Sequence, residues 1–195
     1  MTAKEIAKKL NTILHVERFS DVSNNGLQIE NEGDVTNVAF AVDASLETFE
    51  AAIAAGAQMV IVHHGLSWGN SLARIEGLNY QLIAYAIRHN LAVYGVHLPL
   101  DAHPILGNNA GLAEGLNLQS RRPFLDYHGQ MIGIAGELPK PLSREAFIEK
   151  IKAFIQPPEV RSFFYGSEMI RTVGICSGGA PEGVEQAARE GLDCY

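Results

Sequence analysis

Four of the seven histidines and one aspartate follow two apolar segments of the chain. The first segment, QMVIV, leads into an adjacent histidine pair, and the second, LAVYGV, leads into a His-x-x-x-Asp-x-His pattern. Imidazole and carboxylate groups together suit Zn, Fe, Mn, Co or Ni better than Mg or Ca, which prefer shells of oxygen. The residues that predict a divalent-metal site are His63, His64, His97, Asp101 and His103.

The spacing of these side chains indicates how they could share a site. Adjacent histidines on an extended segment point to opposite sides, so both rarely bind one ion. At the bend into Gly65, His63 and His64 could instead each bind one of two ions about 3.5–4 Å apart, with Asp101 bridging them. His97 is expected to hydrogen-bond a ligand or to carry a proton.

Other polar residues are weaker candidates for a functional role. His103 precedes Pro104, so ordering of the loop and metal binding are equally good interpretations. Asp43 ends a buried segment and could contact a ligand, and the run 177–179, Ser-Gly-Gly, could bind an anion through backbone N–H groups. The remaining histidines are interpreted as surface groups: His15, His89 and His128.

Helical and extended patterns alternate along the first hundred residues, which is typical of βαβ units and a mainly parallel sheet. In such sheets ligands bind beyond the carboxyl ends of the strands, where the predicted metal ligands fall. Helices are predicted at 2–14, 46–55, 76–89, 109–115 and 143–155, and strands within 22–30 and at 36–43, 58–62, 91–97, 130–136 and 160–165.

The chain also contains an internal repeat. Residues 38–60 align without a gap with residues 173–195, and each piece reads as strand, turn, helix, glycine and strand. In the first copy the second strand continues to His63, whereas the second copy stops at Tyr195. We therefore expect the chain to be a fragment. The identical pairs are Val38/Val173, Glu47/Glu182, Glu50/Glu185, Ala52/Ala187 and Gly56/Gly191.

Composition narrows the class of protein. The net charge of −7 disfavours nucleic acid as a partner, because phosphate backbones attract cations. No apolar run approaches the ~20 residues that span a bilayer, so we expect no membrane association. Two cysteines without CxxC spacing are typical of a reducing cytoplasm.

Three segments, VIVHHGLSWGN, YGVHLPLDAHPILGNNAGLAE and SNNGLQIE, resemble the GTP cyclohydrolase I type 2 homologue family, the dinuclear metal-centre proteins of the Ngg-interacting-factor type. The resemblance spans all 195 residues. It implies that His63, His64 and Asp101 are metal ligands, and that a further His and Glu lie beyond Tyr195. It also implies two-lobed α/β subunits in toroidal homohexamers, with the metals facing the inner cavity, and hydrolysis of GTP with ring opening.

The expected architecture is therefore two-lobed α/β, with mostly parallel sheets flanked by helices, a duplicated βαβ unit and an inserted α+β segment. Residues 1–118 are predicted to form the first lobe, carrying His63, His64 and Asp101. Residues 119–195 are predicted to form the inserted segment and an incomplete second lobe.

The expected function is that of a dinuclear metal-dependent hydrolase acting on a small molecule. The complete subunit would hold two divalent ions, with His97 as the catalytic proton carrier. The chain alone is expected to be inactive or weakly metallated. Unrelated phosphoesterases and amidohydrolases are disfavoured, because their His-x-His spacing is absent near His63. The alternative is a non-catalytic, metal-carrying ring scaffold or partner-binding protein.

Overall fold

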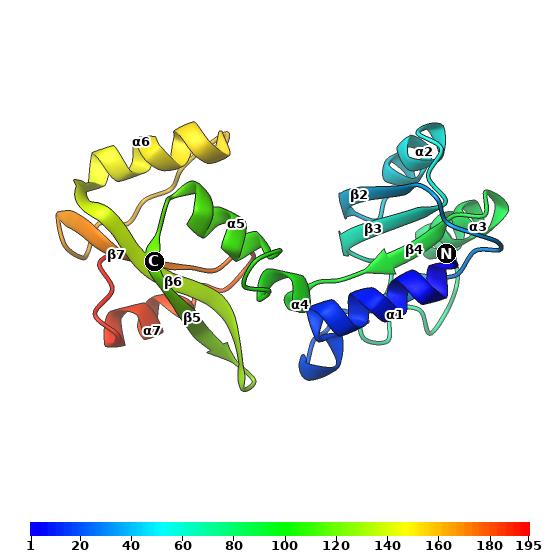
Figure 1. The fold of residues 1–195 in the computed structure, drawn as a ribbon, viewed down its shortest axis with the longest axis horizontal. Helices are drawn as coiled ribbons and strands as arrows, with labels where there is room; N and C mark the ends of the chain where they lie inside the picture. Colours follow the sequence, from blue (N-terminus) through cyan, green and yellow to red (C-terminus); the bar gives the residue numbers. More distant parts are fainter. The chain divides into compact units, whose positions relative to one another are not determined.

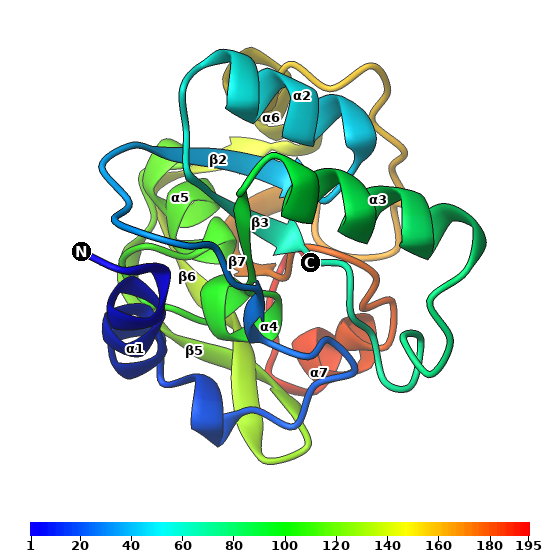
Figure 2. The same cartoon turned by 90° about the vertical axis from the view of Figure 1, so that its right-hand side faces the viewer.

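The computed structural model describes residues 1–195 as two compact units, Met1–Leu100 and Asp101–Tyr195 (Figures 1 and 2). The division lies earlier than the expected boundary after residue 118. The reason is that helix α5 (Asn108–Gly115) buries its alanines in the core of the second unit. Asp101 consequently begins the second unit and does not belong to the lobe that carries the histidine pair.

The first unit contains a four-stranded sheet in the order β1-β4-β3-β2. Strands β2, β3 and β4 are parallel, as predicted, and β1 pairs antiparallel with β4. The predicted turn and short strand within residues 22–30 are confirmed by β1. The strands are β1 (Gly26–Ile29), β2 (Val38–Asp43), β3 (Met59–His64) and β4 (Ala92–Gly95).

Helices cover both faces of this sheet (Figure 1). Alternation along β3 directs Met59 toward the helix α1 side and Val60 toward the α2 and α3 side. Burial on both faces explains the continuous apolar runs of β3 and β4. The run at 36–43 was also predicted to be buried, but β2 lies at the edge of the sheet and exposes Phe40 and Val42. A short helical turn, η1 (Val16–Arg18), connects α1 to β1, and another, α4 (Leu98–Asp101), follows β4 at the boundary between the units. The longer helices of this unit are α1 (Ala3–Leu14), α2 (Leu46–Ala54) and α3 (Gly77–Arg88).

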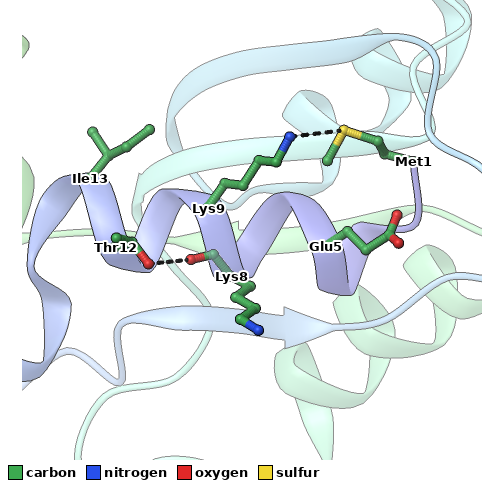
Figure 3. A pocket seen from close by; sticks show the side chains of 6 residues that line it. All are labelled: Met1, Glu5, Lys8, Lys9, Thr12 and Ile13. Carbon is green, nitrogen blue, oxygen red and sulfur yellow. Dashed lines mark hydrogen bonds between the residues drawn. The ribbon is translucent and has the colours of Figure 1, made fainter.

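Helix α1 begins with a capping box, in which the Thr2 hydroxyl accepts from the Glu5 N–H and the Glu5 carboxylate accepts from the Thr2 N–H. Its outer face lines a hollow (Figure 3). There the Lys9 ammonium lies 3.7 Å from the Met1 sulfur. The lining has one carboxylate and no imidazole, so it does not resemble a metal site; it comprises Met1, Glu5, Lys8, Lys9, Thr12 and Ile13.

The second unit is built on a three-stranded sheet, β5-β6-β7, whose neighbours are antiparallel. The mostly parallel pairing expected for the fold is found among β2, β3 and β4 of the first unit, and in the second unit in the bridge between Val173 and Cys194. Helices α5 and α6 pack on this sheet, and α7 contacts β5. Its elements beside α5 are β5 (Gln119–Tyr127), β6 (Gln130–Ser143), α6 (Arg144–Ile155), β7 (Met169–Ile175) and α7 (Gly183–Arg189).

Two predictions in this unit were wrong. Residues 160–165 form no strand, and β5 was missed. Strand β5 joins β6 through a two-residue turn at His128 and Gly129, both with positive φ, as in a type I′ hairpin. A His-Gly pair is a weak signal for such a turn. Strands β5, β6 and β7 share one sheet, so the segment predicted as an insertion contributes strands to the core sheet of the second unit.

The internal repeat is confirmed at the level of register. Val38 pairs with Met59 in the first copy, and Val173 pairs in parallel with Cys194 at the aligned positions of the second. The helix ends also agree: the N–H of Gly56 bonds to the carbonyl three residues earlier, and Gly191 does the same. Both glycines have positive φ, 75° and 70°.

A side chain ties the strands of each copy together at equivalent positions. In the first copy the Gln58 side-chain oxygen accepts from the backbone N–H groups of Thr36 and Asn37, at 3.0 and 2.9 Å. In the second copy Asp193 accepts from two backbone N–H groups at 2.9 Å each. We call these contacts the Gln58 latch and the Asp193 latch.

None of the helices combines the length and apolarity needed to cross a bilayer.

Candidate metal centre

Three histidines meet in the first unit: His63, His64 and His97. One ring nitrogen of each lies within 4.8 Å of those of the other two. The ring centroids are 4.6 Å apart for His63 and His64, 5.0 Å for His63 and His97, and 5.8 Å for His64 and His97. These separations allow a single ion, or two neighbouring ions, to contact all three rings.

The parallel strands explain why these rings meet. β3 ends on the histidine pair, and His97 follows the neighbouring strand β4 at the same carboxyl edge. His63 and His64 fall on opposite faces by the alternation of the strand. The strand ends at His64, however, so the two rings still come close together. The expectation that the carboxyl edge brings these three histidines together is confirmed.

Each ring of the histidine pair is fixed through its Nδ1 atom. His63 Nδ1 lies 3.0 Å from the Val96 carbonyl oxygen, which can only accept, so His63 carries its proton on Nδ1. His64 Nδ1 lies 2.7 Å from Asp43 Oδ1, so Asp43 contacts one of the predicted ligands. A donated Nδ1–H places the lone pair on Nε2, the arrangement found in metal-bound histidines.

His97 is held by Asp21, which the sequence analysis missed. His97 Nδ1 lies 3.0 Å from Asp21 Oδ1, and the Asp21 side chain is 2% exposed. Asp21 also accepts from the Asn25 amide and from the backbone N–H groups of Ser23 and Leu98. Burial alone would raise the pKa of Asp21, but these hydrogen bonds, led by that of His97, lower it to about 2. Asp21 is therefore ionised at neutral pH.

The segment SNNGLQIE holds the loops around the histidines. Asn25 accepts from the His97 backbone N–H at 2.7 Å. Gln28 accepts from the N–H of Leu66 at 2.6 Å, directly after the histidine pair. A Cβ atom at Gly65 would overlap the Gln28 amide. The Asn-Asn-Gly turn is thus a support for the site, whereas its sequence alone suggested only a turn.

The only tryptophan of the chain borders the histidines. The Trp68 ring centroid lies 5.9 Å from that of His64 and 5.1 Å from that of His97. Its indole N–H donates to the Gly65 carbonyl at 2.8 Å, which fixes the ring. The site therefore has an aromatic wall.

Asp101 is a buried residue of the second unit, 3% exposed. Its Oδ1 atom accepts from the Asn108 amide and the Ser177 hydroxyl, each at 2.7 Å. The backbone N–H of Ser177 donates to the Asn109 side-chain oxygen at 2.6 Å. This engagement contradicts the interpretation of Ser177 as part of an anion cradle. Asp101 and the three imidazoles belong to units described separately, so its role as a ligand stays a prediction.

The other histidines behave as structural or surface groups. His103 Nδ1 accepts from the N–H groups of Ile105 and Leu106, at 3.2 and 3.0 Å, which favours the loop-ordering interpretation over metal binding. The three histidines interpreted as surface groups are exposed, which confirms that interpretation: His15, His89 and His128.

The donor set of the first unit fits a divalent metal ion. Three imidazoles present nitrogen ligands, and their Nδ1 partners preset ring orientation and tautomer. Two of those partners, Asp21 and Asp43, carry negative charge that would offset a bound dication. Fold and site together define an α/β protein with a histidine cluster that could hold a metal ion.

Comparison with known proteins identifies the family. The sequence profile of the Duf34/NIF3 (NGG1p interacting factor 3) family matches residues 1–195. A relative from Pyrococcus horikoshii is 40% identical over 193 residues, which cover 97% of this chain and 76% of the relative. A Deinococcus radiodurans relative is 40% identical over 189 residues, covering 97% and 71%. Both are named GTP cyclohydrolase 1 type 2 homolog.

A solved structure shares the fold. The protein ybgI, described as of unknown function, superposes with a TM-score of 0.90 at 32% identity, covering 99% of this chain and 76% of that one. The chain therefore belongs to the Duf34/NIF3 family. The resemblance stated from its sequence motifs is confirmed.

Proposed function

We propose that this chain contributes to a dinuclear metal-dependent hydrolase, in which His63, His64 and Asp101 bind divalent ions. The observation that carries the proposal is the convergence of three imidazoles whose Nδ1 atoms are already engaged. A histidine that is only a surface residue does not need its ring fixed in one orientation. The metal is of the class that imidazole and carboxylate share, namely Zn, Fe, Mn, Co or Ni.

His97 would carry the proton in this reaction. Its hydrogen bond to ionised Asp21 keeps the proton on Nδ1 and the lone pair on Nε2, so Nε2 accepts a proton from an attacking water and returns it to the leaving group. A bound divalent ion would polarise the substrate as a Lewis acid and lower the pKa of a coordinated water toward neutrality. The same Nε2 atom could alternatively bind metal, and the experiment below separates the two roles.

A planar, polar small molecule is the proposed substrate class. The support is the ring of Trp68 beside His64 and His97, on which a flat heterocycle could stack. The name GTP cyclohydrolase 1 type 2 homolog, carried by the relatives, makes GTP the first substrate to test.

The metal proposal is tested by titrating the chain with Co²⁺ or Ni²⁺ and following tryptophan fluorescence. Because Trp68 is the single tryptophan and borders the histidines, quenching that a chelator reverses is expected. His63→Ala should weaken binding by at least about tenfold, since losing even a residue that supports a ligand costs 10–100-fold. His89→Ala, on the exposed end of α3, is the control. Equal binding by the wild type and His63→Ala would exclude this site.

The roles of His97 and of catalysis are tested next. If His97→Gln retains metal affinity but loses turnover, His97 is the proton carrier; if affinity falls as in His63→Ala, it is a ligand. Turnover is assayed with Mn, Fe, Zn and Co on GTP and a small set of nucleotides, esters and amides. The longer Pyrococcus horikoshii relative is assayed in parallel. Absence of metal-dependent hydrolysis from both proteins would leave only a non-catalytic role.

We also propose that the protein is a cytoplasmic homo-oligomer, assembled as a toroidal hexamer. The cytoplasmic assignment is supported by two free cysteines. The assembly is supported by apolar side chains on an edge strand, since Phe40 and Val42 of β2 are 77% and 60% exposed. Burial of such side chains against another copy would stabilise an oligomer.

A further inference from the structure

A hydrogen-bond network in the second unit surrounds Asp101. The Ser177 hydroxyl and the Asn108 amide donate to the same oxygen, Oδ1, at 2.7 Å each. Ser177 lies directly beyond β7, and Asn108 begins helix α5, so the two donors reach the carboxylate from separate elements. Two donors on one oxygen match the ionised carboxylate and restrict its rotation.

Asn109 joins this network to the backbone. It is fully buried, and its amide donates to the carbonyl oxygens of Asp101 and Ile132, at 3.1 and 2.6 Å. Its side-chain oxygen accepts from the Ser177 N–H at 2.6 Å. One side chain thereby fixes the backbone on both sides of the Ser177–Asp101 bond. A buried amide must have its hydrogen bonds satisfied, whereas an apolar side chain would fill the same space without that requirement. The hydrogen bonds of Asn109 therefore indicate a role beyond packing.

We infer that Ser177 is a positioning residue, which together with Asn108 orients the Asp101 carboxylate for binding a divalent cation. The inference rests on the proposed function, because it takes Asp101 to be a ligand. Carboxylates that bind metals are commonly held by hydrogen bonds from neighbouring groups, and those partners tune affinity without touching the ion. Ser177 acts in this way from a position far along the chain, in the second copy of the repeat.

The test compares three changes by calorimetric titration of the whole chain with Zn²⁺ or Mn²⁺. Asp101→Asn establishes whether the carboxylate binds metal. Ser177→Ala removes one donor and should weaken affinity 10–100-fold, the usual effect of losing a group that holds a ligand. Ser177→Thr keeps the hydroxyl and should restore affinity to within about threefold of the wild type.

The chain offers a matched control on the same strand. The Thr172 hydroxyl of β7 donates to the Asp193 carboxylate at 2.9 Å, a bond of the same type. Thr172→Ala should lower thermal stability and leave metal affinity unchanged, which separates positioning from general destabilisation. Asn108→Ala, at an exposed helix end, removes the other donor and provides the readout should Ser177→Ala fail to fold.

Each outcome decides something different. Absence of metal binding by the wild type removes the proposed function, and unchanged binding by Asp101→Asn removes Asp101 from the ligand set; the inference falls in both cases. Weak binding by Asp101→Asn with wild-type affinity in Ser177→Ala, or in Asn108→Ala should the former not fold, overturns the inference alone. Equal losses in Thr172→Ala and Ser177→Ala would also overturn it.

Discussion

The turn after the histidine pair depends on a close contact between two residues. Gln28 sends its amide across the sheet to accept from Leu66 N–H at 2.6 Å and to donate to the Asn24 carbonyl at 2.9 Å. Gly65 leaves the space that this amide fills. The contact fixes the backbone at the position from which His64 projects.

Gly65→Ala should therefore destabilise the protein by about 1–3 kcal/mol, the usual cost of inserting a methyl group into filled space. Metal affinity measured by Trp68 quenching should fall with it. Urea unfolding gives the free energy of unfolding. Gly111→Ala is the control: its Cβ would meet nothing within 4 Å, in helix α5, so it should stabilise by about 0.5–1 kcal/mol. Wild-type stability in Gly65→Ala would contradict this account of the turn.

At the residue scale the sequence singled out the histidines of the candidate site and missed Asp21, which holds one of them. His63, His64 and His97 were found because imidazoles at the ends of apolar strands are conspicuous. Asp21 was not found and the hydrogen bond of Ser177 to Asp101 was not foreseen, since each residue reaches its partner across 76 residues of sequence. Only the folded chain brings such residues together, and an isolated Asp or Ser carries no signal of its role.

At the scale of elements, the two latches of the repeat hold the strands of each copy together through different chemical groups. The Gln58 latch uses a neutral amide, and the Asp193 latch uses a carboxylate. Burial alone would raise the pKa of Asp193, but hydrogen bonds from the Thr172 and Arg171 N–H groups and from the Thr172 hydroxyl lower it below its usual value.

This lowered pKa predicts a stability contribution that depends on pH. A carboxylate whose pKa is lower in the folded state contributes fully above its unfolded pKa, near 3.8, and the contribution is lost as pH falls through the folded value. Asp193→Asn should therefore be less stable than the wild type by about 1 kcal/mol at pH 7, the difference between a charged and a neutral hydrogen bond. The two proteins should converge as the pH falls through the folded-state pKa of Asp193.

Urea unfolding between pH 2.5 and 7 measures this difference. Glu168→Gln, which neutralises an exposed carboxylate of the same unit, controls for the loss of one charge. A constant difference between Asp193→Asn and the wild type across this range would show that ionisation of Asp193 does not contribute.

Most elements of the first unit were predictable, because continuous apolar runs and capped amphipathic helices are strong local signals. The repeat was predictable for the same reason. In the second unit β5 was missed, since its buried side chains are confined to Phe124 and Leu125 amid exposed residues. Its pairing depends on β6 and on an unusual turn, and no local sequence pattern predicts either of them.

At the scale of the whole molecule, the exposed edge of the first sheet predicts self-association. Sedimentation velocity of the chain should show mass above that of the monomer, increasing with concentration. The double variant Phe40→Ser, Val42→Ser should shift the distribution toward monomer, because both side chains lie on one face of edge strand β2.

Ile105→Ser removes an equally exposed apolar side chain from a loop of the second unit and should leave assembly unchanged. A wild-type chain that stays monomeric at all concentrations would contradict the proposed oligomer. Loss of assembly in both variants would indicate a general effect of surface hydrophobicity.

The matched registers and latches also bear on ancestry. Shared hydrogen bonds at aligned positions are more easily inherited than invented twice, so a single ancestral βαβ piece was copied and joined to itself. Since then the latch position has accepted either Gln58 or Asp193 while keeping its backbone partners. The amide and the carboxylate have thus been interchangeable there, and the carboxylate gives one latch an acid sensitivity that the other latch lacks.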